Sequence, residues 1–271
     1  CKLIKKNENK NGKFCFPKYL TTCNPAISIK ELWHPYLNSE DVVTNDLEIG
    51  NNNPQNIIIT GPNAGGKSTT LKSICISLLM GQTLGICPGN ECSFTPFSLI
   101  NTYLNIPDCK GKESLFEAEM HRSRDHIKKL DKLSKSEFAF VIMDEIFSST
   151  NPEEGISGGY AIANKLSSYK NSISVITTHF NYLTKLKETK KFMNLKIPIK
   201  KDSDGNINYP YKIVNGVSDQ FIALDLLKEK GFDNDIVDMA TNICNKIRNE
   251  PEAEPEAEAE PEAELEPKAS S

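Results

Sequence analysis

The apolar residues of the chain fall into patterns that predict strands alternating with helices. Three short runs of consecutive apolar residues, rich in Ile and Val, are typical of strands that are buried on both faces. These runs lie at 56–60, 138–143 and 173–177. Helical periodicity is present at 67–80, 114–133 and 156–168. The alternation predicts an α/β fold with a mostly parallel sheet flanked by helices.

The segment 114–133 is amphipathic, so one face of the expected helix should be buried. We expect its large apolar side chains to point inward, namely Leu115, Met120, Ile127, Leu130 and Leu133. Further along, strands at 195–200 and 207–214 flank Asp204-Gly205-Asn206, which is a hairpin signal. Two helices, 219–230 and 234–248, complete the fold, with Ser218 as N-cap of the first and Gly231 ending it.

Both ends of the chain differ in composition from the rest. Residues 1–15 are rich in Lys and Asn, and we expect them to be disordered or a truncated connection to upstream domains. Residues 250–271 form an acidic low-complexity tail with nine Glu and one Lys, in which regular Pro opposes a continuous helix. Because the whole chain carries −4 and the tail −8, residues 1–249 carry +4. The folded domain, expected over 16–249, is therefore mildly basic, which is compatible with nucleic acid.

Composition also narrows the location of the protein. No run of eighteen apolar residues is present, and the first residues lack the apolar core of a secretory signal. The eight cysteines form no CxxC pair, so we expect reduced thiols in an intracellular protein of the nucleus or cytoplasm, neither secreted nor in a membrane. The chain begins with Cys1 instead of Met, which leaves open that it is a fragment.

A phosphate-binding motif stands between the first predicted strand and its helix. The pattern GxxxxGK followed by Ser or Thr is matched completely by Gly61, Pro62, Asn63, Ala64, Gly65, Gly66, Lys67 and Ser68, with Thr69 next in the helix. The glycines let backbone N–H groups surround phosphate oxygens, and the helix N-terminus favours the same anion. Lys67 is expected to contact the β- and γ-phosphates, and Ser68 to hold Mg²⁺. The motif predicts ATP with Mg²⁺ as its ligands.

Two further strand ends carry chemistry. Asp144 and Glu145 follow the buried strand at 138–143, where an α/β sheet places its ligands. We expect Asp144 to hold Mg²⁺ and Glu145 to orient or activate the attacking water. His179 follows the strand at 173–177, and because three strand ends converge, we favour a γ-phosphate contact over a purely structural role. These residues predict an ATPase with Lys67, Glu145 and His179 as its catalytic groups.

The motifs and their order resemble the ATPase domain of MutS-type DNA mismatch-repair proteins, an ABC-like P-loop ATPase, over about residues 16–246. The family sequences GPNxGGKS, STFMxEM, DEIGRGTS and ATHY are similar to segments 61–68, 114–120, 144–151 and 178–180. The resemblance implies a dimer, with itself or with another MutS-like subunit, in which Ser114 reaches the γ-phosphate held by the opposite subunit. Ser114 as an ordinary N-cap remains the alternative. The resemblance also implies coupling to DNA, mainly through domains that this chain does not contain.

The chain departs from the family at several positions, which indicates a divergent member. Phe147 and Ser148 replace the Gly and Arg of DEIGRGTS. Val42 occupies the place of the aromatic residue that the resemblance implies for adenine stacking, and Tyr211 replaces a His near the end of the domain. Whether Val42 or Tyr211 holds the adenine stays open.

Two other functions compete with this interpretation. One is a nucleotide-gated dimerisation or scaffold protein with little hydrolysis and no mismatch recognition, which the presence of Glu145 disfavours. The other is a transporter or chromosome-maintenance ATPase head. Residues 156–160 resemble the LSGGQ signature of those proteins but follow the acidic pair instead of preceding it.

Overall fold

The computed structural model describes residues 12–37, 42–104, 114–202, 207–218 and 223–249. The chain divides into two compact units, Cys1–Phe221 and Ile222–Ser271. Three predictions, namely a disordered or connecting N-terminus before residue 12, the hairpin turn at 204–206 and the acidic tail, lie outside the described residues. No helix in the described ranges has both the length and the apolar character that crossing a membrane requires.

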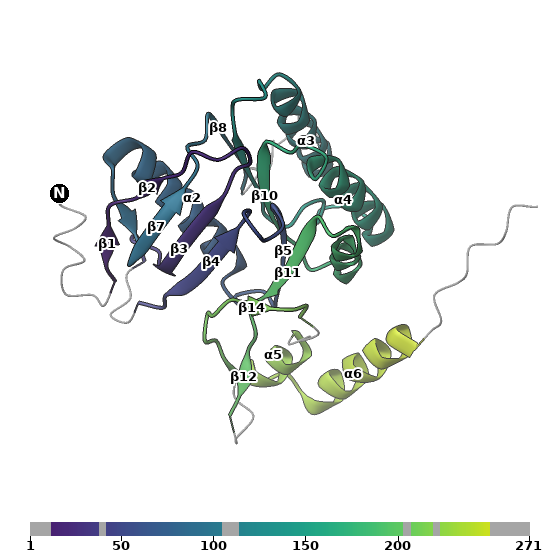
Figure 1. Ribbon diagram of the computed structural model, residues 1–271. Coiled ribbons are helices and arrows are strands. Elements are labelled where there is room, and N and C mark those ends of the chain that lie inside the picture. The colour runs from purple at the N-terminus through teal and green to yellow at the C-terminus, as the bar shows by residue number, and fades with distance from the viewer. Residues whose placement is uncertain (1–11, 38–41, 105–113, 203–206, 219–222, 250–271) are drawn as a thin grey trace, which may run out of the picture. The chain divides into compact units, whose positions relative to one another are not determined.

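A six-stranded sheet in the order β14-β11-β5-β10-β9-β8 forms the centre of the first unit (Figure 1). Its five parallel strands are β5 (Asn56–Thr60), β8 (Leu99–Tyr103), β9 (Ala139–Met143), β10 (Ser172–Thr177) and β11 (Phe192–Lys196). The short strand β14 (Val214–Asn215) pairs antiparallel with β11. The three predicted strands and the mostly parallel sheet are therefore confirmed.

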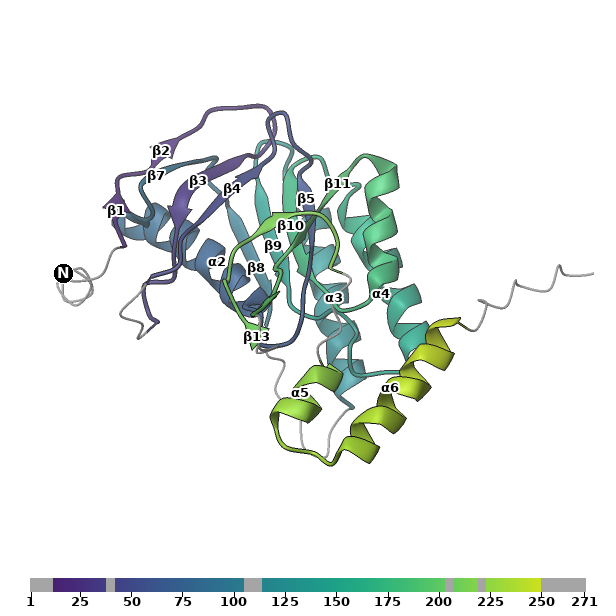
Figure 2. The same ribbon diagram turned by 90° about the horizontal axis from the view of Figure 1, so that it is seen from below.

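Alternate residues of the central strands face two different hydrophobic cores. Ile57 and Ile59 pack into one core and Ile58 into the other, which is why β5 is buried at every position. Helix α2 (Lys67–Leu84) contributes apolar side chains to the first core. Helices α3 (Leu115–Asp131) and α4 (Pro152–Leu166) and the 3₁₀ segment η1 (Asn181–Thr189) border the second. Figures 1 and 2 show α2 on one side of the sheet and α3 and α4 on the other.

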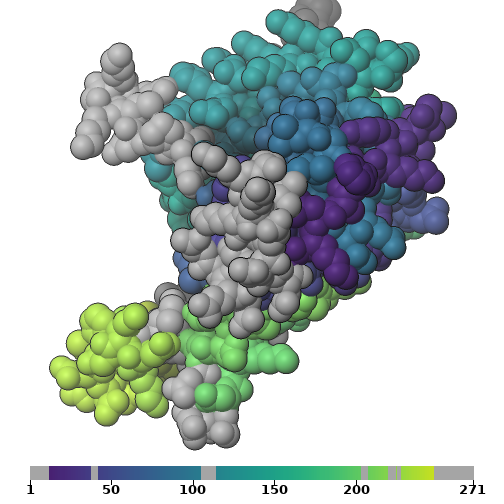
Figure 3. Space-filling model, turned by 90° about the vertical axis from the view of Figure 1, so that its left-hand side faces the viewer, coloured from purple at the N-terminus to yellow at the C-terminus, as the bar shows by residue number. Residues whose placement is uncertain are grey.

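The residues before and after the P-loop helix also build a mostly antiparallel region that the apolar pattern did not predict. A four-stranded sheet has the order β2 (Lys18–Tyr19), β7 (Glu91–Phe94), β3 (Ile27–Leu32) and β4 (Asn45–Ile49), in which only β2 and β7 pair parallel. The pair β1 (Phe14–Cys15) and β6 (Cys87–Pro88) lies beside it. Figure 3 shows these purple N-terminal residues against the blue segment that carries β6 and β7. Strands β1, β2 and β6 have two residues each, which is too short for a period-two signal.

The inward face predicted for α3 is partly wrong. Leu115 and Met120 are 37% and 42% exposed, whereas Leu130 is buried as expected. The helix instead buries Glu119, Ser123 and His126, because it packs on β8, an edge strand that presents polar side chains of its own. Burial lowers the pKa of His126 to about 4, so the imidazole is neutral at pH 7.

The C-terminal elements follow the predicted order with shifted boundaries. The hairpin strands are only β12 (Lys200–Lys201) and β13 (Ile207–Asn208), while Leu195 and Val214 belong to the central sheet. The predicted first hairpin strand is thus displaced, because Leu195 completes the buried run that pairs with β5. Helices α5 (Ala223–Glu229) and α6 (Asn234–Asn249) are present, and Gly231 has the left-handed φ of 79° expected at a helix end.

Candidate functional site

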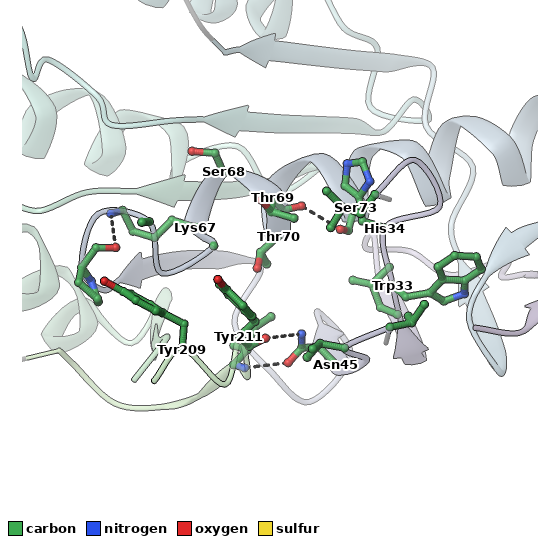
Figure 4. A pocket seen from close by; sticks show the side chains of 18 of the residues that line it. Trp33, His34, Asn45, Lys67, Ser68, Thr69, Thr70, Ser73, Tyr209 and Tyr211 are labelled. Carbon is green, nitrogen blue, oxygen red and sulfur yellow. Dashed lines mark hydrogen bonds between the residues drawn. The ribbon is translucent and has the colours of Figure 1, made fainter. Parts of the chain in front are cut away.

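A pocket of about 700 Å³ opens over the N-terminus of α2 (Figure 4). One wall is the P-loop together with the first turn of α2, where Lys67, Ser68, Thr69 and Thr70 line the pocket. The opposite wall comes from segments distant in sequence, within 32–37, 42–45 and 209–213. The structure therefore brings most of the predicted P-loop residues together in one cavity large enough for a nucleotide.

The backbone of the P-loop is shaped for an anion. Ala64 and Gly66 have φ of 64° and 100°, and Gly66 precedes α2 at the N-cap position without any side-chain cap. The first N–H groups of α2 consequently face the pocket without the oxygen that an N-cap side chain supplies elsewhere. A phosphate is the group that such a helix start accepts.

Lys67 lies inside the P-loop with only 4% of its side chain exposed. Its Nζ donates to Gly61 O at 3.0 Å, to Pro62 O at 3.2 Å and to Asn63 Oδ1 at 3.3 Å. The same Nζ lies 3.4 Å from Glu145 Oε1. The structure thus places Lys67, which is predicted to bind phosphate, next to Glu145, the predicted catalytic carboxylate.

Asp144 and Glu145 are held at the carboxyl end of β9 by a residue of the neighbouring strand. Thr177 Oγ1 donates to Asp144 Oδ1 at 2.6 Å and accepts the backbone N–H of Glu145 at 2.9 Å. Sequence reasoning missed this function of Thr177, although its place at the end of a predicted strand next to the acidic pair was the available signal. Thr177 therefore orients the Asp144 carboxylate and holds the backbone of Glu145.

The oxygen atoms near the phosphate site suit a magnesium ion. Ser68 offers a hydroxyl from the first turn of α2. Asp144 uses Oδ1 in its hydrogen bond to Thr177, and its Oδ2 takes no part in that bond. Hydroxyl, carboxylate and phosphate oxygens are the ligands that Mg²⁺ prefers. The donor set therefore fits the metal that the sequence predicts.

Five predicted site residues do not line this pocket, namely Gly61, Gly65, Asp144, His179 and Ser114. His179 is exposed at the end of β10, with its ring centroid 4.6 Å from that of Phe180. Ser114 is exposed at the start of α3, where it forms a capping box with Glu117: its Oγ accepts from Glu117 N at 3.2 Å, and Glu117 Oε2 accepts from Ser114 N at 2.8 Å. Within one chain, Ser114 therefore acts as an N-cap.

Tyrosines line the wall that faces the P-loop. The rings of Tyr209 and Tyr211 are nearly parallel, at 17° with centroids 6.0 Å apart, and Val42 also lines the pocket. The segment is held by Asn45, whose Nδ2 donates to Tyr211 O at 3.0 Å and whose Oδ1 accepts from Ile213 N at 2.8 Å (Figure 4). A Cβ on Gly66 would lie 3.2 Å from Tyr211 Cδ1, so the ring borders the P-loop itself. Asn45 and Tyr209 were not among the residues that the sequence predicted.

Comparison with known proteins identifies the family of the chain. The family model of MutS domain V matches residues 57–248. "Endonuclease MutS2" of Pediococcus pentosaceus is 28% identical over 244 residues, which are 87% of this chain and 30% of that protein. "DNA mismatch repair protein MutS" of Alkaliphilus oremlandii is 27% identical over 241 residues, 87% of this chain and 27% of the relative. "DNA mismatch repair protein MSH3" of Vanderwaltozyma polyspora is 27% identical over 261 residues, 93% of this chain and 25% of the relative.

The chain therefore spans less than a third of the length of these curated relatives. The matched range contains the P-loop, the acidic pair after β9 and His179. Since the family model covers most of the chain and every strand of the central sheet, the chain belongs to the MutS domain V family, the ATPase domain of mismatch-repair proteins.

Proposed function

We propose that this chain binds and hydrolyses ATP as a P-loop module of the ABC type, and that it couples nucleotide state to DNA within a longer MutS-like protein. The observation that carries the proposal is the 3.4 Å separation of Lys67 Nζ and Glu145 Oε1 inside the P-loop pocket. A phosphate ligand and a carboxylate base must converge on the same phosphoryl group for hydrolysis.

The residues divide the chemistry between them. Backbone N–H groups of the P-loop and the start of α2 bind the phosphates, and Lys67 places a positive charge on the β- and γ-phosphates. Glu145 orients a water and accepts its proton. His179 lies outside the pocket lining and is assigned to the γ-phosphate because β10, which it follows, lies between β5 and β9. Ser68 and Asp144 would hold a magnesium ion, which would neutralise charge on the phosphate oxygens.

The nucleotide base has its place at the opposite wall, on Tyr211 with Val42 beside it. Tyr211→Ala is expected to weaken ATP binding about tenfold, because stacking on an aromatic ring contributes roughly 1–3 kcal/mol per base. Binding of inorganic triphosphate should not change. Asn45→Ala should act in the same direction, since its two hydrogen bonds hold the Tyr211 segment.

Calorimetric titration of both ligands measures this difference. Tyr182→Ala is the matched control, because Tyr182 is 45% exposed and lies on η1 away from the pocket. Equal loss of ATP and triphosphate affinity in Tyr211→Ala would show that Tyr211 supports the P-loop and does not hold a base.

Dimerisation completes the proposed site. Ser114 is exposed and does not line the pocket of its own chain. Both conditions are needed for Ser114 to contact a γ-phosphate bound by a second copy. With Glu145→Gln and Mg-ATP, the chain is expected to shift from monomer toward dimer, whereas ADP leaves it monomeric, because the γ-phosphate supplies the contact that favours the dimer. The dimer partner is a second copy or another MutS-like subunit.

Sedimentation with variants at Ser114 tests the cross-subunit contact. Ser114→Ala should weaken the ATP-bound dimer but leave monomer ATP binding unchanged. Ser114→Asp keeps a good N-cap and places a negative charge where the phosphate lies, so it should abolish the dimer with the helix intact. Asn151→Ala removes the N-cap of α4 instead, where Asn151 Oδ1 accepts from Glu153 N, and controls for capping alone. Monomeric profiles with ATP up to tens of micromolar would exclude a homodimeric site.

A further inference from the structure

The segment that follows Glu145 contacts the first two turns of α3 at two points. The ring of Phe147 meets that of Phe116 edge to face, with centroids 5.5 Å apart and planes at 72°. Ser149 Oγ donates to Glu119 Oε2 at 2.6 Å. Phe147 and Glu119 are 4% and 5% exposed, so each contact has one buried partner, whereas Phe116 is half-buried and Ser149 is exposed. Because Phe116 and Glu119 are three residues apart, they share one face of α3.

Helix α4 is shaped around the same segment. A Cβ on Gly158 would lie 2.7 Å from Phe147 Cδ2, and a Cβ on Gly155 would lie 2.5 Å from Phe147 O. These two glycines make room for the ring and for the carbonyl of Phe147. Gly158, the first of two glycines in the run 156–160 that resembles a transporter signature, thus packs against an aromatic ring.

The backbone adopts an unfavourable conformation to place this ring. Glu145 and Phe147 have φ of 52° and 54°, in the left-handed region that costs a non-glycine residue on the order of 1 kcal/mol. The family sequence DEIGRGTS, which segment 144–151 resembles, has glycine where Phe147 stands. A glycine would adopt this φ without cost but would lose the contacts with Phe116 and Gly158.

We infer that Phe147 is a positioning residue, which together with the Ser149–Glu119 hydrogen bond fixes the N-terminus of α3 relative to Glu145. Ser114 is the N-cap of α3, two residues before Phe116. These contacts therefore fix the position of Ser114, which is offered to a second copy's nucleotide, relative to Glu145, which acts on the chain's own nucleotide. This inference rests on the role of Ser114 in the proposed function.

The decisive measurement is a double-mutant cycle on steady-state ATP turnover with Phe147→Gly, Ser114→Ala and the combination. Phe147→Gly should lower kcat about tenfold, since a misplaced contact is costly to catalysis. KM should change less than twofold, because Phe147 does not line the pocket. The double variant should be no slower than Ser114→Ala alone, because both changes remove the same contact.

The outcomes separate the inference from the proposed function. If Ser114→Ala slows turnover but Phe147→Gly does not, or if the two losses multiply, Phe147 does not position Ser114 and the proposed function stands. If Ser114→Ala changes neither turnover nor dimerisation, the cross-subunit role falls and the inference with it. A raised KM in Phe147→Gly would also overturn the inference, because it would show a disturbed pocket.

Two further variants guard against simple unfolding. Gly158→Ala should reproduce the Phe147→Gly effect by displacing the ring, and it should become neutral in the Phe147→Gly background, where the ring is gone. If Phe147→Gly does not fold, Phe147→Leu is carried through the same cycle. Phe97→Leu is its matched control, since Phe97 is 5% exposed and packs on Phe140 in the other core.

Discussion

Replacing Glu145 with Gln is expected to slow ATP turnover by about 10²-fold or more, which is the range for losing a positioned general base. The affinity for ATP should not fall. Glu145 Oε1 is 3.4 Å from Lys67 Nζ, so removing its charge frees the ammonium from a competing partner. Single-turnover kinetics and equilibrium titration with Mg-ATP measure the two effects separately.

Glu154→Gln is the matched control for charge removal, because Glu154 is an exposed carboxylate in the first turn of α4. It should leave turnover unchanged. If Glu145→Gln loses ATP affinity to the same extent as it loses turnover, Glu145 is a binding group and the role of base must be assigned elsewhere.

Lys67→Ala should weaken ATP binding by roughly ten- to a hundredfold, since hydrogen bonds to charged groups are worth about 1.5–3 kcal/mol and each 1.4 kcal/mol is tenfold. The loss should extend to inorganic triphosphate, because Lys67 acts on phosphates and not on the base. Tyr211→Ala, by contrast, should weaken the binding of ATP but not of triphosphate.

Lys72→Ala controls for a lysine lost from the same helix, because Lys72 lies on α2 outside the pocket lining. Thermal unfolding without nucleotide checks that Lys67→Ala keeps its fold, since Lys67 Nζ also donates to Gly61 O and Pro62 O. Unchanged triphosphate affinity in a folded Lys67→Ala protein would contradict the phosphate role of Lys67.

The central sheet could be predicted from the sequence because its strands are buried on both faces. A strand such as Ile57-Ile58-Ile59 has no polar side to preserve, so a continuous β-branched run identifies it without knowledge of its partners. The P-loop was equally predictable, since its glycine, lysine and serine requirements are local to one turn.

The face of α3 was not predictable, because its burial depends on the partner strand. Placing Met120 inward assumes an apolar partner, but β8 offers Asn101 and Tyr103, and polar side chains meet polar ones. Likewise, Asn45 acts on Tyr211 through a hydrogen bond between residues 166 positions apart. No local pattern encodes such a contact, so the wall of the pocket opposite the P-loop emerged only from the structure.

Strand β5 has a consequence for the synthesis of the protein. Ile57 pairs with Val175 on one side and with Met193 on the other, so neither edge of β5 has its partner until more than a hundred further residues exist. At translation rates of about 5–20 residues per second, an apolar β-branched strand stays open for on the order of ten seconds. Chains that end before β10 keep both edges of this strand unpaired, the condition under which strands pair with other molecules and aggregate.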